Sequence, residues 1–336
     1  MGIKEKIYTT NEQFKTKPFW IRWSAGLVVL ALLVMVVVGM YWSREPDLID
    51  TTAEVQSHLK DGKVPTGIAS AVALKSLMKE LLYKPGGLLS NDASPPGMYL
   101  DNIPAFEYGA IFQIRDFTRA FRKDFSRSQT QSSDDDDLKI VENKFSIDVK
   151  SWAFPAAESE YEEGIRSLDK YIARLNTGNA HFYARADNLY TWLSDVESRL
   201  GSLSLNLSQS VGLAGIDTTT TGTEASGSDT TSTITKTSWF KLDDVFYEAR
   251  GQAWALIHLL KAVEVDFQDV LAKKNALVPL RQIIRELEAS QAPVWSPMIL
   301  NGSGYGILAN HSLTLANYIS RATAGIAGLR QLLKNG

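Results

Sequence analysis

Four consecutive aspartates, Asp134 to Asp137, are the densest group of possible metal ligands in the sequence. Carboxylate oxygens bind Ca²⁺, so a calcium site is the chemistry that this run suggests. An EF-hand loop, however, needs alternating ligands, a glycine in mid-loop and a closing glutamate, and the run has none of that spacing. Acidic residues at a helix N-terminus complement the helix dipole. We therefore favour the start of a helix over a calcium site.

A second acidic group consists of Glu158, Glu160, Glu162 and Glu163. Glycosidases use two carboxylic acids that flank the scissile bond, so these residues could serve an enzyme that degrades the cell wall. They fall in the first turns of an expected helix, where dipole compensation and solvation also account for acidic side chains. We favour that simpler role and assign no catalytic residue.

The four histidines are scattered, and no pair has the i, i+4 spacing of a zinc-binding helix; they are His58, His181, His258 and His311. The chain has no cysteine, which excludes disulfides and thiolate metal sites. It also has neither a Walker loop nor a G-x-S-x-G elbow. The sequence therefore predicts no metal-binding residue and no cofactor.

One loop is retained as a candidate site. Asn301, Gly302, Ser303 and Gly304 precede the last expected helix, and exposed amide groups at such a place could hold an anion such as phosphate. Glycines there more often serve only to let the chain turn tightly. A ligand sensor would use this loop together with the Pro/Gly/Asn-rich segment 88–103, with the second loop spanning about 291–306.

The elements that would position these residues begin with an uncharged run, Ser24 to Trp42. At about 1.5 Å per residue this run just crosses a hydrocarbon core of roughly 30 Å. Trp20 and Trp23 stand at one end and Tyr41 and Trp42 at the other, where amphipathic rings prefer the headgroup level. We predict a single transmembrane helix over 24–42, with the lipid bilayer as partner.

Charge predicts the orientation of this helix. Basic residues outnumber acidic ones before it and leave a net charge of +3: Lys4, Lys6, Lys15, Lys17 and Arg22 against Glu5 and Glu12. Because the whole chain carries −3, the part after the helix carries −6. Short basic segments stay in the cytoplasm, so residues 1–23 are expected inside and residues 43–336 outside. A cleaved signal peptide would need small residues at a cleavage site, whereas this run ends in Gly39, Met40, Tyr41 and Trp42. We therefore expect an uncleaved anchor.

The rest of the chain has mostly helical patterning. Thr66 can cap a helix that runs to about Tyr83. Apolar residues alternate four and three positions apart over Tyr161–Leu175, over Phe182–Leu207, and for about 30 residues from Leu242 to Val270. The last helix, about Gly306 to Lys334, carries the stripe Leu308, Leu315, Ile319, Ala322, Ile326, Leu329 and Leu333. Such spacing is typical of helices that pack side by side at small angles. We predict an all-α fold with an elongated helical bundle.

Residues 215–238 divide the exported part. This Thr/Ser/Gly-rich segment has almost no apolar side chains, so it cannot bury enough surface to offset its ordering entropy. We predict a flexible tether between helical regions 43–214 and 239–336, with the second packing on the first.

Several strings resemble a bacterial family known as domain of unknown function 2333: RDFTRAFRKDFSRSQTQSSDDDDL (115–138), HFYARADNLYTWL (181–193), KLDDVFYEARGQAWALIHLLKAVEVDFQDVLAKKNAL (241–277) and SPMILNGSGYGILANHSLTLANYISR (296–321). The resemblance covers most of the chain from the expected anchor to Leu333. It implies a bacterial inner-membrane protein that faces the periplasm. The family has no assigned activity, so no residue inherits a role.

The function expected from all of this is binding rather than catalysis. An acidic exported domain argues against nucleic acid, whose phosphates are bound by Lys and Arg. We expect a non-enzymatic scaffold or accessory subunit of a cell-envelope complex, with a protein partner or a second copy of the chain bound to the bundle. The alternatives are an enzyme acting on peptidoglycan and a periplasmic ligand sensor.

Overall fold

The computed structural model describes residues 19–59, 64–128, 133–212, 237–238, 241–296, 298–303 and 307–335, with the backbone alone for residues 19–22. Most of the predicted tether, residues 215–236, lies outside these ranges, as do residues 1–18 and Gly304. The chain is 71% helical and the described residues contain no strand, which confirms the all-α prediction.

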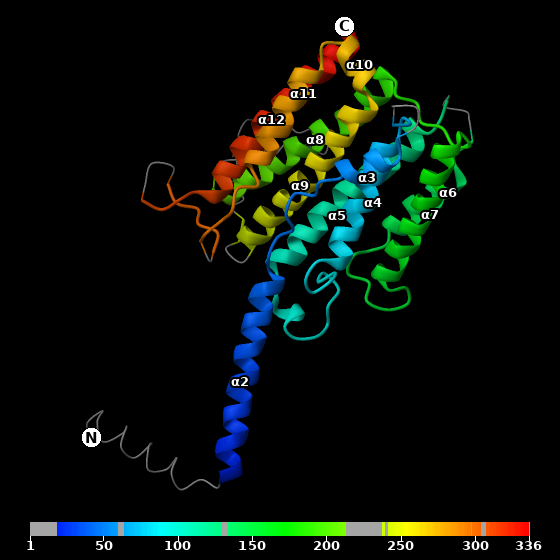
Figure 1. Ribbon diagram of the computed structural model, residues 1–336. Helices are drawn as coiled ribbons and strands as arrows, with labels where there is room; N and C mark the ends of the chain where they lie inside the picture. The colour runs from blue at the N-terminus through cyan, green and yellow to red at the C-terminus, as the bar shows by residue number, and fades with distance from the viewer. Residues whose placement is uncertain are drawn as a thin grey trace, which may run out of the picture.

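A long helix, α2, leaves one end of a helical bundle, and the C-terminus lies at the opposite end (Figure 1). The elements in chain order are α2 (Phe19–Trp42), α3 (Thr52–Ser57), α4 (Ile68–Tyr83), the short 3₁₀ turn η1 (Gly97–Tyr99), α5 (Asn102–Ala120), the π-helical turn η2 (Phe121–Phe125), α6 (Asp136–Phe145), α7 (Ala157–Thr177), α8 (Ala186–Ser210), α9 (Leu242–Asp266), α10 (Gln268–Lys273), α11 (Leu277–Ala289) and α12 (His311–Asn335).

The centre of the bundle is a close crossing of α5 and α9. A methyl group at Gly109 would lie 2.1 Å from the carbonyl oxygen of Glu248, and one at Gly251 would lie 2.0 Å from that of Phe106. Glycine alone lets two backbones approach this closely. Around this pair, α9 also packs against α4, α8 and α11, while α12 lies along α8 and α6 lies along α7.

Aromatic rings fill the core where α5 runs into η2. Phe117 stacks edge-on against Trp192 of α8, with ring centroids 5.0 Å apart. Phe125 meets Phe267 at 5.2 Å, between α9 and α10. Edge-to-face pairs of this kind contribute roughly 0.5–1.5 kcal/mol beyond the area they bury. The rings therefore join α5 and η2 to α8 and to the junction of α9 and α10 in one core.

The predicted heptad seams face this core. All residues of the stripe on α7 are buried, and so are Leu189, Leu193, Val196, Leu200, Leu203 and Leu207 of α8. Two predicted helices have different bounds in the structure. The seam from Leu242 to Val270 is interrupted at Phe267, which separates α9 from α10. The last helix begins at His311 rather than Gly306, and Leu308 is exposed instead of buried.

Candidate functional site at the junction of the apolar helix and the bundle

The part of α2 whose side chains the structure describes, Trp23–Trp42, has an apolar surface that the bundle leaves mostly uncovered. This segment is long and apolar enough to cross a membrane, with a mean hydropathy of 2.5, by length and composition. Trp23 and Tyr41 are exposed at the two ends, whereas Trp42 is half-buried against the bundle. The side chain of Trp20 lies outside the described residues.

The last turn of α2 packs into the loop between α4 and α5. A methyl group at Gly39 would lie 3.6 Å from Cβ of Pro96 and 3.8 Å from a methyl carbon of Leu100. One turn later the indole of Trp42 covers Gly86, whose φ of +87° lies in the left-handed region that glycine favours. The end of α2 is therefore in contact with folded structure rather than hanging free.

A buried ion pair shapes this loop. Nζ of Lys84 lies 2.6 Å from Oε1 of Glu107, and both side chains are excluded from solvent. Glu107 also accepts hydrogen bonds from the amide groups of Leu89 and Ser90, at 3.0 and 2.8 Å. Lys84 donates in addition to the carbonyl oxygen of Gly87 at 2.7 Å. Removing both charges from water is costly, and the mutual attraction of the pair together with these hydrogen bonds offsets that cost while holding the loop backbone.

Beyond Trp42 the chain forms an extended strap, residues 43–50, that lies along α9. Nε and Nη2 of the buried Arg250 donate to the carboxylate of Glu45 at 2.8 and 2.5 Å. Nη1 of the same guanidinium donates to the carbonyl oxygens of Ser290 and Ala292, at 3.0 and 3.1 Å. Arg250 thus ties the strap, α9 and the end of α11 together.

Two further residues of α9 hold the strap backbone. The indole of Trp254 donates from Nε1 to the carbonyl oxygen of Asp47 at 3.1 Å. The amide of Ile49 donates to Nε2 of His258 at 2.8 Å, and Nδ1 of His258 lies 2.7 Å from the carbonyl oxygen of Trp254. These contacts require a neutral ring with its proton on Nδ1. Burial lowers the pKa of His258 to about 4, which agrees with that form.

The apolar helix and the bundle are thus one joined architecture, and a family model described as "Uncharacterized protein conserved in bacteria (DUF2333)" matches residues 15–336, from before α2 to the end of α12. The chain belongs to this family. No curated protein and no solved structure matches the chain. The family description names no activity, so the site must be interpreted from its own chemistry.

A second surface of this family member is a groove of about 610 Å³ between α5 with η2 on one side and α8 on the other, with α9 as its floor. Asp116 and Arg199 form an ion pair across it, and the guanidinium of Arg199 lies 4.2 Å from the ring centroid of Phe112. Burial raises the pKa of Glu248 on the floor, and burial together with the charge of Asp195 raises the pKa of Asp124. The groove therefore presents both signs of charge in a partly desolvated setting.

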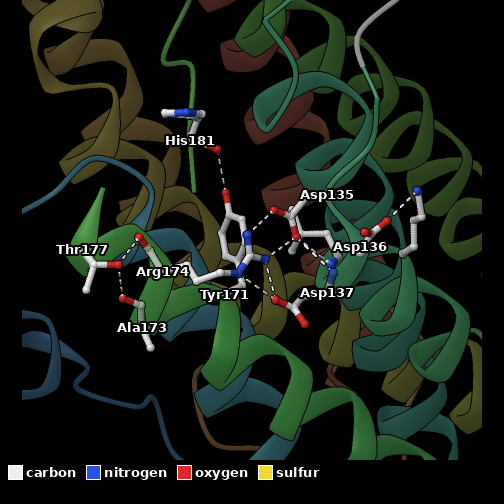
Figure 2. A network of polar contacts seen from close by, with 10 residues as sticks. Asp135, Asp136, Asp137, Tyr171, Ala173, Arg174, Thr177 and His181 are labelled. Carbon is white, nitrogen blue, oxygen red and sulfur yellow. Dashed lines mark hydrogen bonds and ion pairs between the residues drawn. The ribbon is translucent and has the colours of Figure 1, made fainter. Parts of the chain in front are cut away.

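The four aspartates lie at the start of α6, as the sequence predicts. Asp135 caps the helix by accepting from the amide groups of Asp137 and Leu138. Arg174 of α7 binds both oxygens of Asp135, at 2.6 and 2.8 Å, and reaches Asp137 as well (Figure 2). Asp134 pairs with Arg122. Among the described residues no group of His, Cys, Asp and Glu could hold a metal ion.

The glutamates of α7 are also engaged with neighbours. Lys144 lies 2.8 Å from Glu160 and 2.7 Å from Glu163. Glu158 accepts from the side-chain Nδ2 of Asn91 at 2.9 Å, and Glu162 accepts from the hydroxyl of Tyr83 at 3.0 Å. These contacts join α6, α7 and the loop after α4, and they leave no pair of these acids facing each other across a cleft in the described part of the chain.

The candidate loop of Asn301 to Ser303 pairs with the residues just before α12. Gly302 donates its amide to the carbonyl oxygen of Ala309 at 3.1 Å, and Asn301 bridges to Asn310. The first amides of α12 already have acceptors, because Leu313 donates to Oδ1 of Asn310 at 2.9 Å. His311, the first residue of α12, accepts from the amide of Leu300, whereas the ring of His58 meets the side chain of Asn176, so these two histidines have separate surroundings. The anion site remains a prediction.

The sequence analysis did not predict the contacts between α9 and the strap that follows α2. Arg250, Trp254 and His258 fall in a heptad-patterned helix, where they look like flanking residues. The i, i+4, i+8 spacing of these three large polar side chains was the available signal, since it places them on one face of α9. What that face contacts depends on residues some 200 positions earlier.

Proposed function

We propose that this protein is a non-enzymatic, single-pass membrane protein of the bacterial inner membrane whose helical bundle binds a protein partner in the periplasm. In this role it serves as a scaffold or accessory subunit of a cell-envelope complex. The observation that carries the proposal is the joint between α2 and the bundle. Arg250, Trp254 and His258 hold the strap, and the loop after α4 holds the last turn of α2.

A rigid joint suits a scaffold. A bundle held by contacts on both sides of its anchor cannot swing freely, so its surfaces stand in a constant orientation to the membrane. Partners in a membrane complex gain from this arrangement, because less orientational freedom is lost when they bind. The basic segment before α2 and the acidic character of the rest support a bundle on the outer side.

The groove between α5 and α8 is the surface we assign to the partner. It carries Arg119 and Lys123 on one wall and Asp195 on the other, with Asp116 and Arg199 between them. Alternating charges in a long depression fit a helical or extended segment of a partner that bears the opposite pattern, and such complementarity confers specificity more than raw affinity. A second copy of this chain is one form that the partner can take.

Affinity purification of the full chain from membranes in mild detergent tests the proposal. The double variant Arg119→Glu, Lys123→Glu reverses two exposed charges in the groove. The matched control, Arg166→Glu with Lys139→Glu, reverses two exposed charges on α7 and α6. We expect one stoichiometric partner with the wild type and the control, and its loss from the groove variant. Retention by the groove variant refutes the assigned surface, and the absence of any partner after cross-linking in cells refutes the scaffold.

A further inference from the structure

Three loops at the α2 end of the bundle expose large apolar side chains. Loop A joins α4 to α5 (residues 88–101), loop B joins α6 to α7 (146–156), and loop C is the described part of the connection from α11 to α12 (290–310). Phe154 is fully exposed, Trp295 is 92% exposed, and Trp152 and Tyr99 are 70% and 69% exposed. The other members are Met98, Met298, Ile307 and Leu308.

Such side chains are not spread evenly over the bundle. Every exposed aromatic residue that the structure describes outside α2 lies in one of these loops, at the end of α4 (Tyr83) or near the start of α5 (Tyr108). The other exposed large apolar residues of the described chain outside α2 and these loops are aliphatic, namely Leu48, Leu59, Ile140, Leu205, Val265 and Val278. Single aliphatic side chains on a surface are ordinary, whereas clustered aromatic ones mark an interaction site.

The position of loop A relative to a bilayer follows from its contact with α2. Pro96 and Leu100 pack against Gly39, which lies inside the apolar span that ends at Trp42. Met98 and Tyr99 stand between these two residues in the chain and point away from the bundle core. If α2 crosses a bilayer, loop A therefore reaches the level of the headgroups or slightly below it.

Hydrogen bonds hold loops B and C at the same height along α2 as loop A. Nδ2 of Asn91 in loop A donates to the carbonyl oxygen of Ser151 in loop B at 3.0 Å. Arg250 joins the first residues of loop C, through the carbonyl oxygens of Ser290 and Ala292, to Glu45 just beyond α2. Figure 1 shows all three connections at the end of the bundle from which α2 emerges.

We infer that the α2 end of the bundle rests on the outer surface of the same bilayer, with Tyr99, Trp152, Phe154 and Trp295 in its headgroup–acyl boundary. Tyr and Trp prefer that zone, because their rings are apolar and each carries one polar group that can stay in water, whereas Phe154 contributes a purely apolar ring. The inference rests on the proposed membrane anchoring by α2. It adds a second, peripheral contact that fixes the tilt of the bundle.

The chemistry of this contact is apolar rather than electrostatic. The loops carry three aspartates, Asp92, Asp101 and Asp148, against one lysine, Lys150, and a net acidic surface does not attract anionic lipids. A zwitterionic surface such as phosphatidylethanolamine or phosphatidylcholine is the matching partner. The contact should therefore depend neither on anionic lipid nor on low salt.

Depth measurement on the full chain tests the inference, and the absence of native cysteine makes single labels simple. Nitroxide labels are placed at Phe154→Cys and Trp295→Cys, in nanodiscs of phosphatidylcholine. The matched control is Val278→Cys, which is 72% exposed near the opposite end of the bundle. We expect the loop labels to be severalfold more accessible to oxygen, relative to a water-soluble relaxant, than the control label, at high salt as at low salt.

The outcomes separate this inference from the proposed anchoring. A label at Val34→Cys, in the middle of α2, reports whether the helix is in the bilayer. Loop labels in water together with a Val34 label in lipid would overturn the peripheral contact alone. A Val34 label in water would overturn the anchoring. Insertion of the loop labels only when phosphatidylglycerol is added would overturn the apolar mechanism.

Discussion

Arg250 of α9 donates two hydrogen bonds, of 2.8 and 2.5 Å, to the carboxylate of Glu45. Glu45 lies three residues beyond the end of α2. The guanidinium is buried and carries three backbone carbonyl partners as well. A charge in this setting needs its counterion, because an unpaired buried charge is costly. This pair is therefore one of the contacts that set where the apolar helix meets the bundle, together with those of Trp254 and His258.

Glu45→Gln should lower the free energy of unfolding by about 1–3 kcal/mol, the range for losing a charged hydrogen-bond partner in a buried setting. It should also broaden the distance distribution between spin labels on α2 and on α9. Thermal melting and double electron–electron resonance of the full chain in nanodiscs measure the two effects. Asp47→Asn is the matched control, since Asp47 is exposed and the strap uses its backbone carbonyl. Equal behaviour of the two variants would show that the ion pair does not fix the joint.

Protease added to spheroplasts should digest the chain after Ser43 and leave it untouched in intact cells. The physical reason for this expectation is the excess of basic residues before α2, since short segments rich in Lys and Arg stay on the cytoplasmic side. Immunoblotting with an antibody against α12 follows the digestion. Survival of the bundle in spheroplasts, with a periplasmic marker digested in the same sample, would contradict the orientation.

His258 should make the bundle less stable as the pH falls. Its pKa is about 4 in the folded chain because of burial, against 6.5 for an exposed histidine. Between these values the unfolded state binds more protons, so stability is complete above pH 6.5 and falls as the pH drops toward 4. The total loss is on the order of 3 kcal/mol.

The variant His258→Gln isolates this effect, since an amide can accept the hydrogen bond from Ile49 but cannot be protonated. Burial raises the pKa of Asp266 to about 6, so this residue makes the folded state more stable as the pH falls, opposite to His258 over the same pH range. Asp266 is present in both the wild type and the variant, so its contribution cancels in the comparison. The difference between wild type and variant in urea denaturation at pH 7.5 and pH 5 therefore reports His258. A difference that does not change with pH would refute the assignment.

Gly251→Ala should destabilise the bundle by several kcal/mol, above the usual range of about 1–3 kcal/mol for overpacking. The new methyl group would lie 2.0 Å from a backbone carbonyl of α5, which cannot move aside without separating the two helices. Gly201→Ala on α8 is the control, because nothing lies within 4 Å of the new group. We expect the control to be neutral or more stable by about 0.5–1 kcal/mol. Circular dichroism melting distinguishes the two, and similar melting temperatures would argue against the close crossing.

Ile319→Asp should unfold the bundle. Ile319 is completely buried on α12, where an unpaired carboxylate would cost several kcal/mol against a total stability of roughly 5–15 kcal/mol. Leu205→Asp on the neighbouring α8 places the same charge at a side chain that is 46% exposed, and it should be tolerated. A folded Ile319→Asp chain with an unchanged helical signal would mean that this stripe faces a partner instead.

Local pattern was sufficient for most of the helical architecture. Composition alone marks α2, because an uncharged stretch of that length has few other uses. Heptad spacing identified the buried faces of α7 and α8, because residues three and four apart necessarily lie on one side of a helix. The acidic run at Asp134–Asp137 was recognised as a helix start for the same local reason.

What those faces contact was decided by the tertiary structure. Thr66 was expected to cap α4, yet the amide groups of Gly67 and Ser70 donate to the carboxylate of Asp266, nearly 200 residues later, at 2.7 Å. Asp266 stands immediately before the break at Phe267 that interrupts the predicted seam. Periodicity tells which side of a helix is buried, but it carries no information about the partner. The joint of Glu45 with Arg250, and the common end of the three aromatic loops, therefore exist only in the folded chain.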